Sequence, residues 1–282
     1  MIIKYIRIIK LKIVIGNLLS LISGFLLSSR IIKVININLL NYTILGMFFL
    51  LISNCLLNNY IDRDIDIIMD RTKNRLLINN KILSLSILLI SIILAILGLT
   101  ILFITNNLLV FILSILATII YVVFYSFYLK RYSLYSTFIG SLSGAMPPII
   151  GYCSVSNFNF ESLILMLIFI VWQIPHFYSL SIIYINDYKK ANIPVLPLHY
   201  GYLITKKYII ISIILYILLI FLLYTITNNN IYFITINIPI MILWLFLSLK
   251  NNNIDSWAKK VFILSIISIN VFNLSILSYY KI

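Results

Sequence analysis

Residues 39–66 read LLNYTILGMFFLLISNCLLNNYIDRDID, an apolar run that leads directly into a group of polar and acidic side chains. The apolar part is long enough to cross a bilayer as a helix, which takes about 20 residues. Asn58, Asp62 and Asp66 stand at four-residue spacing, so on a helix they share one face. Two carboxylates one turn apart repel each other unless a cation lies nearby. Oxygen ligands of this kind suit Mg²⁺, which usually binds through one or two carboxylates together with substrate phosphates.

The composition of the whole chain is that of a membrane protein. It has 282 residues, of which 62% are hydrophobic and only 10% are charged, and its mean hydropathy is +1.11. Soluble domains carry about a quarter charged residues. Apolar stretches predict nine spans, near 13–29, 39–61, 82–104, 107–128, 135–153, 160–182, 207–227, 231–249 and 259–279. The prediction is an all-α polytopic membrane protein with a single domain over residues 1–282.

The net charge of +14 is distributed in a way that indicates a membrane rather than a nucleic acid. Of the 21 Lys and Arg residues, only Arg30, Lys33 and Lys281 fall on one side of the predicted membrane, and the others fall on the opposite side. Cytoplasmic loops carry the excess of basic residues. We therefore expect a cytoplasmic N-terminus, an external C-terminus and no nucleic-acid partner.

The two longest polar loops, 62–81 and 183–206, both lie on the predicted cytoplasmic side, four spans apart. This spacing suggests an internal duplication of a four-helix unit, over 13–128 and 135–249, followed by a ninth helix.

Proline and cysteine residues inside the apolar stretches give weaker indications. Pro147, Pro148 and Pro175 are expected to kink or break the fifth and sixth spans. Cys55 and Cys153 lie in apolar runs without any CxxC pattern, so we expect two free thiols rather than a disulfide or a metal site.

The acidic group around Asp62 has two interpretations. It is either a solvated helix end whose carboxylates pair with neighbouring basic side chains, or a ligand site. Asn58 lies inside the span, where polar groups are expensive and usually functional. Basic residues follow at once, which suits a phosphate ligand bridged by a metal; they are Arg63, Arg71, Lys73 and Arg75.

Three further positions also remain open at this point. Lys130 and Arg131 end the fourth span and are either membrane anchors or contacts to an anionic ligand. His176 follows Pro175 inside the sixth span and is either a hydrogen-bonded interior histidine or a residue that faces substrate.

The pattern NxxxDxxxD at the end of the second span resembles the first aspartate motif of the UbiA superfamily of intramembrane prenyltransferases. Three longer blocks, Asn58–Arg75, Tyr125–Cys153 and Trp172–Pro197, are similar to one branch of it, the protohaem IX farnesyltransferases or haem O synthases. The resemblance implies a nine-helix bundle around an intramembrane cavity. It also implies transfer of the farnesyl group of farnesyl diphosphate to a vinyl group of haem B, which gives haem O.

The resemblance also assigns roles to residues. It implies that Asn58, Asp62 and Asp66 hold Mg²⁺ on the diphosphate. Many superfamily members carry a second DxxxD after the sixth span, but this chain has YINDYKKA, with Asp187 as its only carboxylate there. Substrate contacts are then expected from basic, histidine and acidic side chains, namely Arg63, Arg71, Lys73, Arg75, Lys130, Arg131, His176 and Asp187.

The same resemblance implies a multi-pass protein of the bacterial inner membrane whose active site faces the cytoplasm. Farnesyl diphosphate, haem B and the lipid bilayer are the expected partners, together with a haem A synthase or terminal oxidase assembly. One alternative is a prenyltransferase for an aromatic quinone precursor, against which the missing second DxxxD and the PHFYSLS block argue. The other is a transporter or structural membrane protein. Charges that cluster at one face, rather than at mid-membrane, argue against a transport pathway.

Overall fold

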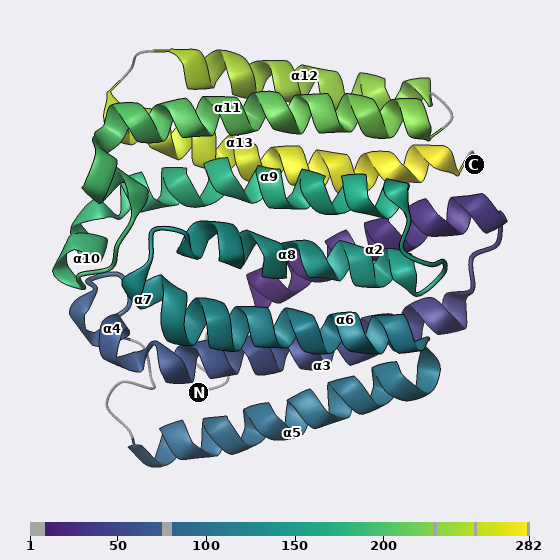
Figure 1. Cartoon of the computed structure of the whole chain (residues 1–282), viewed down its shortest axis with the longest axis horizontal. Coiled ribbons are helices and arrows are strands. Elements are labelled where there is room, and N and C mark those ends of the chain that lie inside the picture. The colour runs from purple at the N-terminus through teal and green to yellow at the C-terminus, as the bar shows by residue number, and fades with distance from the viewer. Residues whose placement is uncertain (1–8, 75–80, 228–229, 251–252, 281–282) are drawn as a thin grey trace.

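The computed structural model describes residues 9–74, 81–227, 230–250 and 253–280, and within these ranges every regular element is a helix. Eight helical segments are long and apolar enough to cross a membrane, which confirms the predicted polytopic all-α class. They run roughly alongside one another as a bundle (Figure 1). These segments are α2 (Leu11–Ile32), α3 (Ile37–Ile61), α5 (Lys81–Thr105), α6 (Leu108–Ile119) with its continuation, α9 (Phe160–Ile183), α11 (Leu196–Ile226), α12 (Ile231–Leu249) and α13 (Ile254–Ser275).

The remaining predicted span forms α8 (Ser136–Cys153), a helix that is rich in serine and glycine and is not among these eight segments. Most of its residues are buried, and it packs between α2 and α9 (Figure 1). Small residues let the backbones approach closely: a Cβ on Gly24 would lie 1.9 Å from the Pro148 carbonyl oxygen, and one on Gly151 would lie 2.0 Å from that of Leu21. Small-residue seams of this kind are typical of membrane helix pairs.

The three prolines do not break their helices. Pro147 and Pro148 lie inside α8, and Pro175 lies inside α9, and both helices continue through them. The prolines therefore do not break these helices, because neighbouring helices in a bundle accommodate backbone groups that proline frees. A kink, the other expected outcome, stays a prediction. The interruption occurs instead in α11, at Gly201, whose φ of 77° is easily adopted only by glycine.

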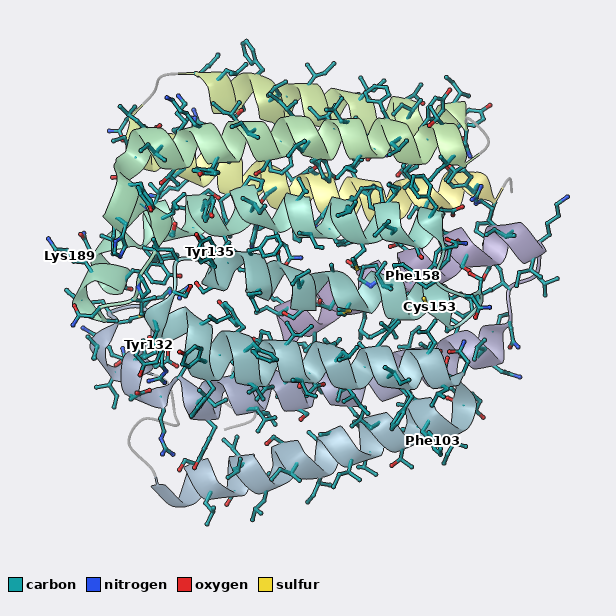
Figure 2. All side chains as sticks on the ribbon, viewed as in Figure 1. Phe103, Tyr132, Tyr135, Cys153, Phe158 and Lys189 are labelled. Carbon is teal, nitrogen blue, oxygen red and sulfur yellow. The ribbon has the colours of Figure 1, made fainter. Side chains whose placement is uncertain are left out.

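Short helices follow two of the spans at the same end of the bundle. They are α4 (Arg63–Ile68) after α3 and α10 (Ile185–Lys190) after α9, and they lie beside α7 (Lys130–Tyr132) at the left in Figure 1. Tyr132 and Lys189 lie at this end, and Phe103 and Phe158 lie toward the opposite one (Figure 2). A small apolar cluster of Ile65, Met69 and Ile193 joins the two loop regions. The two long polar loops of the sequence therefore pack against each other at this end of the bundle.

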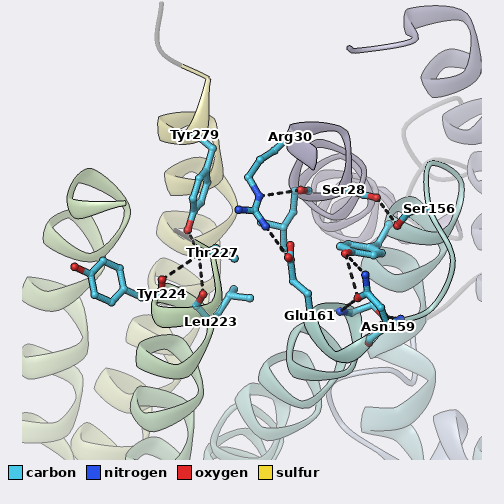
Figure 3. A network of polar contacts seen from close by, with 12 residues as sticks. Ser28, Arg30, Ser156, Asn159, Glu161, Leu223, Tyr224, Thr227 and Tyr279 are labelled. Carbon is cyan, nitrogen blue, oxygen red and sulfur yellow. Dashed lines mark hydrogen bonds and ion pairs between the residues drawn. The ribbon is translucent and has the colours of Figure 1, made fainter. Parts of the chain in front are cut away.

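A polar network lies at the opposite end of the bundle (Figure 3). Arg30 Nη2 lies 2.6 Å from Glu161 Oε2, and its guanidinium also lies 5.1 Å from the centre of the Tyr279 ring. Ser28 and Ser156 share a hydrogen bond of 2.8 Å across the same end. The network links α2, α9 and η2 (Ile276–Tyr279), so it ties the first span to the last. 

Both cysteines are buried and free, as predicted.

Candidate functional site

A buried polar group forms where α3 ends. The Asn58 amide donates hydrogen bonds to Asp62 Oδ2 at 2.8 Å and to Ser126 Oγ at 3.0 Å. Lys130 Nζ lies 2.5 Å from the same Asp62 oxygen, and Lys10 Nζ donates to Asn58 Oδ1. Only 3% of the Asp62 side chain is exposed. Residues from three segments of the chain therefore meet around the Asn58–Asp62 pair.

The helical spacing predicted for this segment is confirmed. The backbone N–H of Asp62 donates to Asn58 O, and the N–H of Asp66 donates to Asp62 O at 2.8 Å. The chain thus keeps a helical path from α3 into α4, although the structure divides it into two elements at Asp62. Asp66 is buried, like Asn58 and Asp62.

A π-helix supplies Ser126 of this group and leads directly into Lys130, and it was not foreseen from sequence. The element η1 (Ile120–Leu129) continues α6, contains Ser126 and ends directly before Lys130. Segments of π-helix are rare and often occur at functional sites. Tyr121 and Tyr125 stack within it, with ring centres 5.8 Å apart. The only signal in the sequence was a lone serine within the aromatic run YVVFYSFYL.

The residues present fit a cation that is shared with an anionic ligand. Asp62 Oδ1 is buried and has no hydrogen-bond partner in the described part of the chain, so one carboxylate oxygen remains available. Within those same residues no three His, Cys, Asp or Glu side chains gather into a complete metal cage. Mg²⁺ commonly takes one or two carboxylates and completes its shell with phosphate oxygens and water.

Asp187 lies at the junction of the two loop regions. Its carboxylate oxygens accept hydrogen bonds from the backbone N–H groups of Asp70, at 3.1 Å, and Arg71, at 3.2 Å. Lys190 pairs with the Asp70 carboxylate, and the Arg71 guanidinium lies 4.6 Å from the centre of the Tyr184 ring. Because Asp187 is itself buried, these contacts hold α10 against the loop that follows α4.

Exposed ion pairs surround this junction. Hydrogen bonds from Lys190 and from Lys73 lower the pKa of Asp70 to about 2. A carboxyl whose pKa is lowered on folding contributes stability above its ordinary pKa, and loses that contribution as the pH falls toward 2. Arg131 donates two hydrogen bonds to Asp64 and lowers the pKa of that carboxyl. The Asp64–Arg131 pair borders a hollow of about 230 Å³ between the two loop regions.

The other predicted site residues have separate surroundings. The Arg63 guanidinium lies 4.4 Å from the centre of the Tyr60 ring. Arg75 lies outside the described residues. His176 makes its contacts between α9 and α13, not with the group around Asp62. The structure therefore brings together Asn58, Asp62 and Lys130, adds Lys10 and Ser126, and gives His176 an environment of its own.

Fold and site together define a class, namely an integral membrane helical bundle with a buried carboxylate, amide and lysine group near one end. Oxygen donors and basic side chains arranged in this way suit an anionic ligand bound with a divalent cation. The chain belongs to the UbiA prenyltransferase family, whose model matches residues 17–267.

Curated relatives extend over nearly the whole chain. The Protoheme IX farnesyltransferase of Baumannia cicadellinicola is 44% identical over 277 residues, which cover 96% of this chain and 95% of that protein. The Protoheme IX farnesyltransferase of Photorhabdus laumondii is 42% identical, over 95% of this chain and 92% of that protein. The resemblance inferred from the three sequence blocks is thereby confirmed.

Solved structures share the fold at low sequence identity. A structure of digeranylgeranylglyceryl phosphate synthase has a TM-score of 0.81 and 23% identity, and the match covers 100% of this chain and 99% of that one. A UbiA homologue from Archaeoglobus fulgidus, solved with GPP and Mg²⁺, has a TM-score of 0.70 and 16% identity, with 97% of this chain and 99% of that one covered. These likenesses establish the bundle architecture.

Proposed function

We propose that this protein is a Mg²⁺-dependent protohaem IX farnesyltransferase, which moves the farnesyl group of farnesyl diphosphate to a vinyl group of haem B and forms haem O. The observation that carries the proposal is the near full-length similarity to proteins of that name, at 42–44% identity. Membership of a prenyltransferase family argues against a transporter or structural protein. The named relatives favour haem over a quinone precursor as the acceptor.

The buried group around Asp62 would bind the diphosphate end of the donor. Asn58, Asp62 and Asp66 would hold Mg²⁺, which when bound neutralises charge that develops on the diphosphate leaving group. The unpaired Asp62 Oδ1 supports this assignment. The Asn58 amide orients the other Asp62 oxygen, and Lys130 adds a positive charge 2.5 Å from it. Transfer breaks the allylic C–O bond to diphosphate, and a positive charge beside the diphosphate would stabilise that leaving group.

The remaining residues of the proposed site divide into two groups. Basic side chains at the same end of the bundle would contact phosphate oxygens, and they are Arg63, Arg71, Lys73 and Arg131. We propose the same role for Arg75, which lies outside the described residues. Asp187 would act indirectly, since its carboxylate oxygens already accept backbone hydrogen bonds from the loop. His176 would serve the haem side of the reaction.

The proposal includes a cellular setting. The basic residues of the loops support an orientation with this site toward the cytoplasm and the C-terminus outside. A bacterial inner membrane is the corresponding location. A haem A synthase or a terminal oxidase assembly is the kind of partner that would receive the product.

The test is haem analysis by mass spectrometry in a host that lacks this activity of its own. Expression of the parent chain should produce haem O. Asp62→Asn and Asp66→Asn should each abolish it while the protein still inserts, because each removes a charge needed at the diphosphate. Asp255→Asn is the matched control, since Asp255 is an exposed carboxylate in the first turn of α13. Near-parental haem O from either site variant would contradict the metal assignment, and no haem O from the parent would contradict the function.

A further inference from the structure

His176 is held among aromatic rings on α9 and α13. Its ring centre lies 5.3 Å from that of Trp172, with an interplanar angle of 29°, and 4.8 Å from that of Phe262, at 30°. Phe177 meets it edge-on at 5.3 Å. Trp172 Nε1 also donates to Ser265 O at 2.7 Å, which ties the two helices together at this level. The imidazole therefore has a defined orientation. Its possible roles depend on which of its two nitrogens carries the proton.

The contacts of Ser265 identify which nitrogen carries the proton. Ser265 Oγ lies 2.6 Å from the carbonyl oxygen of Phe262 and 2.8 Å from His176 Nδ1. Two oxygens 2.6 Å apart must share a hydrogen bond, and a carbonyl group has no proton to donate. The Ser265 hydroxyl therefore donates its proton to Phe262 O. Ser265 Oγ can then only accept at its other contact, and Nδ1 must donate. A neutral imidazole carries one N–H, so Nε2 is left with a lone pair.

This tautomer limits the roles open to His176. No described residue forms a hydrogen bond with Nε2. A bare Nε2 cannot donate to a haem propionate, because both are acceptors. As a general base it would become a cation inside an apolar span, which is expensive. Binding a metal ion requires only the lone pair, and histidines that ligate metals typically donate their other ring N–H to a neighbouring oxygen.

We propose that Ser265 holds His176 in the tautomer that offers Nε2 to the iron of the haem substrate, so that His176 is an iron ligand and Ser265 is its positioning residue. This rests on the proposed haem-directed function and extends it to one substrate contact. It links two residues 89 positions apart in the chain.

The tautomer can be measured without any substrate. The chain has only two histidines, so ¹⁵N-histidine labelling of the full-length protein gives two imidazoles, and His199→Ala leaves one. The Nδ1–H form is expected for His176 in the parent. Ser265→Ala should produce a different tautomer or a mixture. Ser268→Ala is the matched control, because Ser268 is also fully buried on α13 but its hydroxyl bonds Tyr216. An Nε2–H form in the parent, or the parental form in Ser265→Ala, would overturn the role of Ser265.

Iron ligation is tested by titrating purified protein with protohaem and recording its absorption and electron paramagnetic resonance spectra. The parent should show an imidazole-ligated iron. His176→Ala should lose that signature, and added imidazole should restore it, which also shows that the variant is folded. Ser265→Ala should weaken haem affinity about 10- to 100-fold, the range typical of lost partners of metal ligands. Ser268→Ala and His199→Ala should bind as the parent does.

Two results would overturn the assignment of His176 as a ligand. One is a parent without an imidazole-ligated spectrum, and the other is a His176→Ala variant with the parental spectrum and affinity. Neither depends on turnover, so haem O production by the parent still decides the proposed function separately. If the parent makes haem O and His176→Ala keeps the parental spectrum, then His176 is not an iron ligand, but the proposed function stands.

Discussion

At the scale of single residues, the buried charges of Lys130 and Asp62 compensate each other inside the bundle. The two side chains lie 2.5 Å apart and are 18% and 3% exposed. Removing one partner of a buried pair leaves the other charge uncompensated, at a cost of about 3–5 kcal/mol. Lys130→Met should therefore lower the free energy of unfolding by about that amount, measured by thermal or denaturant unfolding in detergent.

The double variant Asp62→Asn/Lys130→Met separates charge burial from function. It should regain much of the stability that Lys130→Met loses, because no buried charge remains, but it should stay inactive. Arg131→Met is the control, since its partner Asp64 is 60% exposed and such pairs contribute at most about 1 kcal/mol. If the double variant is no more stable than Lys130→Met, the uncompensated charge of Asp62 does not explain the stability that Lys130→Met loses.

Asp187 belongs to the same scale, because one carboxylate joins two loops. Asp187→Ala removes both acceptors of the Asp70 and Arg71 amides, so trypsin should cleave after Arg71 or Lys73 faster than in the parent. Asp187→Asn keeps one side-chain oxygen and should be intermediate. Lys190→Ala removes only an exposed ion pair and should change little. Parental cleavage in Asp187→Ala, together with an increased Mg²⁺ requirement, would instead indicate a direct metal ligand.

At the scale of elements, the π-helix η1 sets the rotation of the fourth span. Each residue of an α-helix turns the chain by about 100°. Deleting Val123, which is 49% exposed, should let a regular helix form and turn Ser126 and Lys130 away from Asn58 and Asp62. Haem O production should be lost while membrane insertion persists. Val123→Ala is the control and should remain active, and an active deletion variant would show that the π-helix is dispensable.

At the scale of the whole molecule, charge and the two loop ends predict one orientation in the membrane. The native cysteines are buried, so single introduced cysteines can report it. A membrane-impermeant maleimide should label Asn157→Cys in intact cells, because we predict that the end of the bundle with Asn157 is external. It should label Asn192→Cys only after permeabilisation. Both positions are exposed in the structure. The reverse pattern would place the proposed site outside and contradict the positive-inside assignment.

The order of elements also supports the duplication expected from the loop spacing. In each half a short helix follows the second long one, α4 after α3 and α10 after α9. We propose that residues 13–128 and 135–249 are two copies of a four-helix unit, to which α13 is added. Superposition of the halves in an experimental structure should place α3 and α4 on α9 and α10, and a failure of that match would remove the proposal.

The features that could be predicted from the amino-acid sequence are those that depend on local patterns. Long apolar runs identified the helices, and four-residue spacing placed Asn58, Asp62 and Asp66 on one helical path, because helix geometry repeats over a few residues. The three similar blocks indicated the family, which the relatives confirm. Single prolines and glycines were less informative: α8 and α9 continue through their prolines, and α11 bends at Gly201.

Contacts between side chains that are distant in the sequence could not be predicted, because they depend on how the helices pack. Ser126 and Lys130 reach the Asn58–Asp62 pair because η1 changes the rotation of its span, and no local pattern announced that change. Asp187 contacts backbone N–H groups, whose position depends on how two loops pack. The Ser265 hydroxyl, on another helix, determines which ring nitrogen of His176 carries the proton. Such contacts arise from the crossing of helices, which side-chain packing over the whole bundle determines.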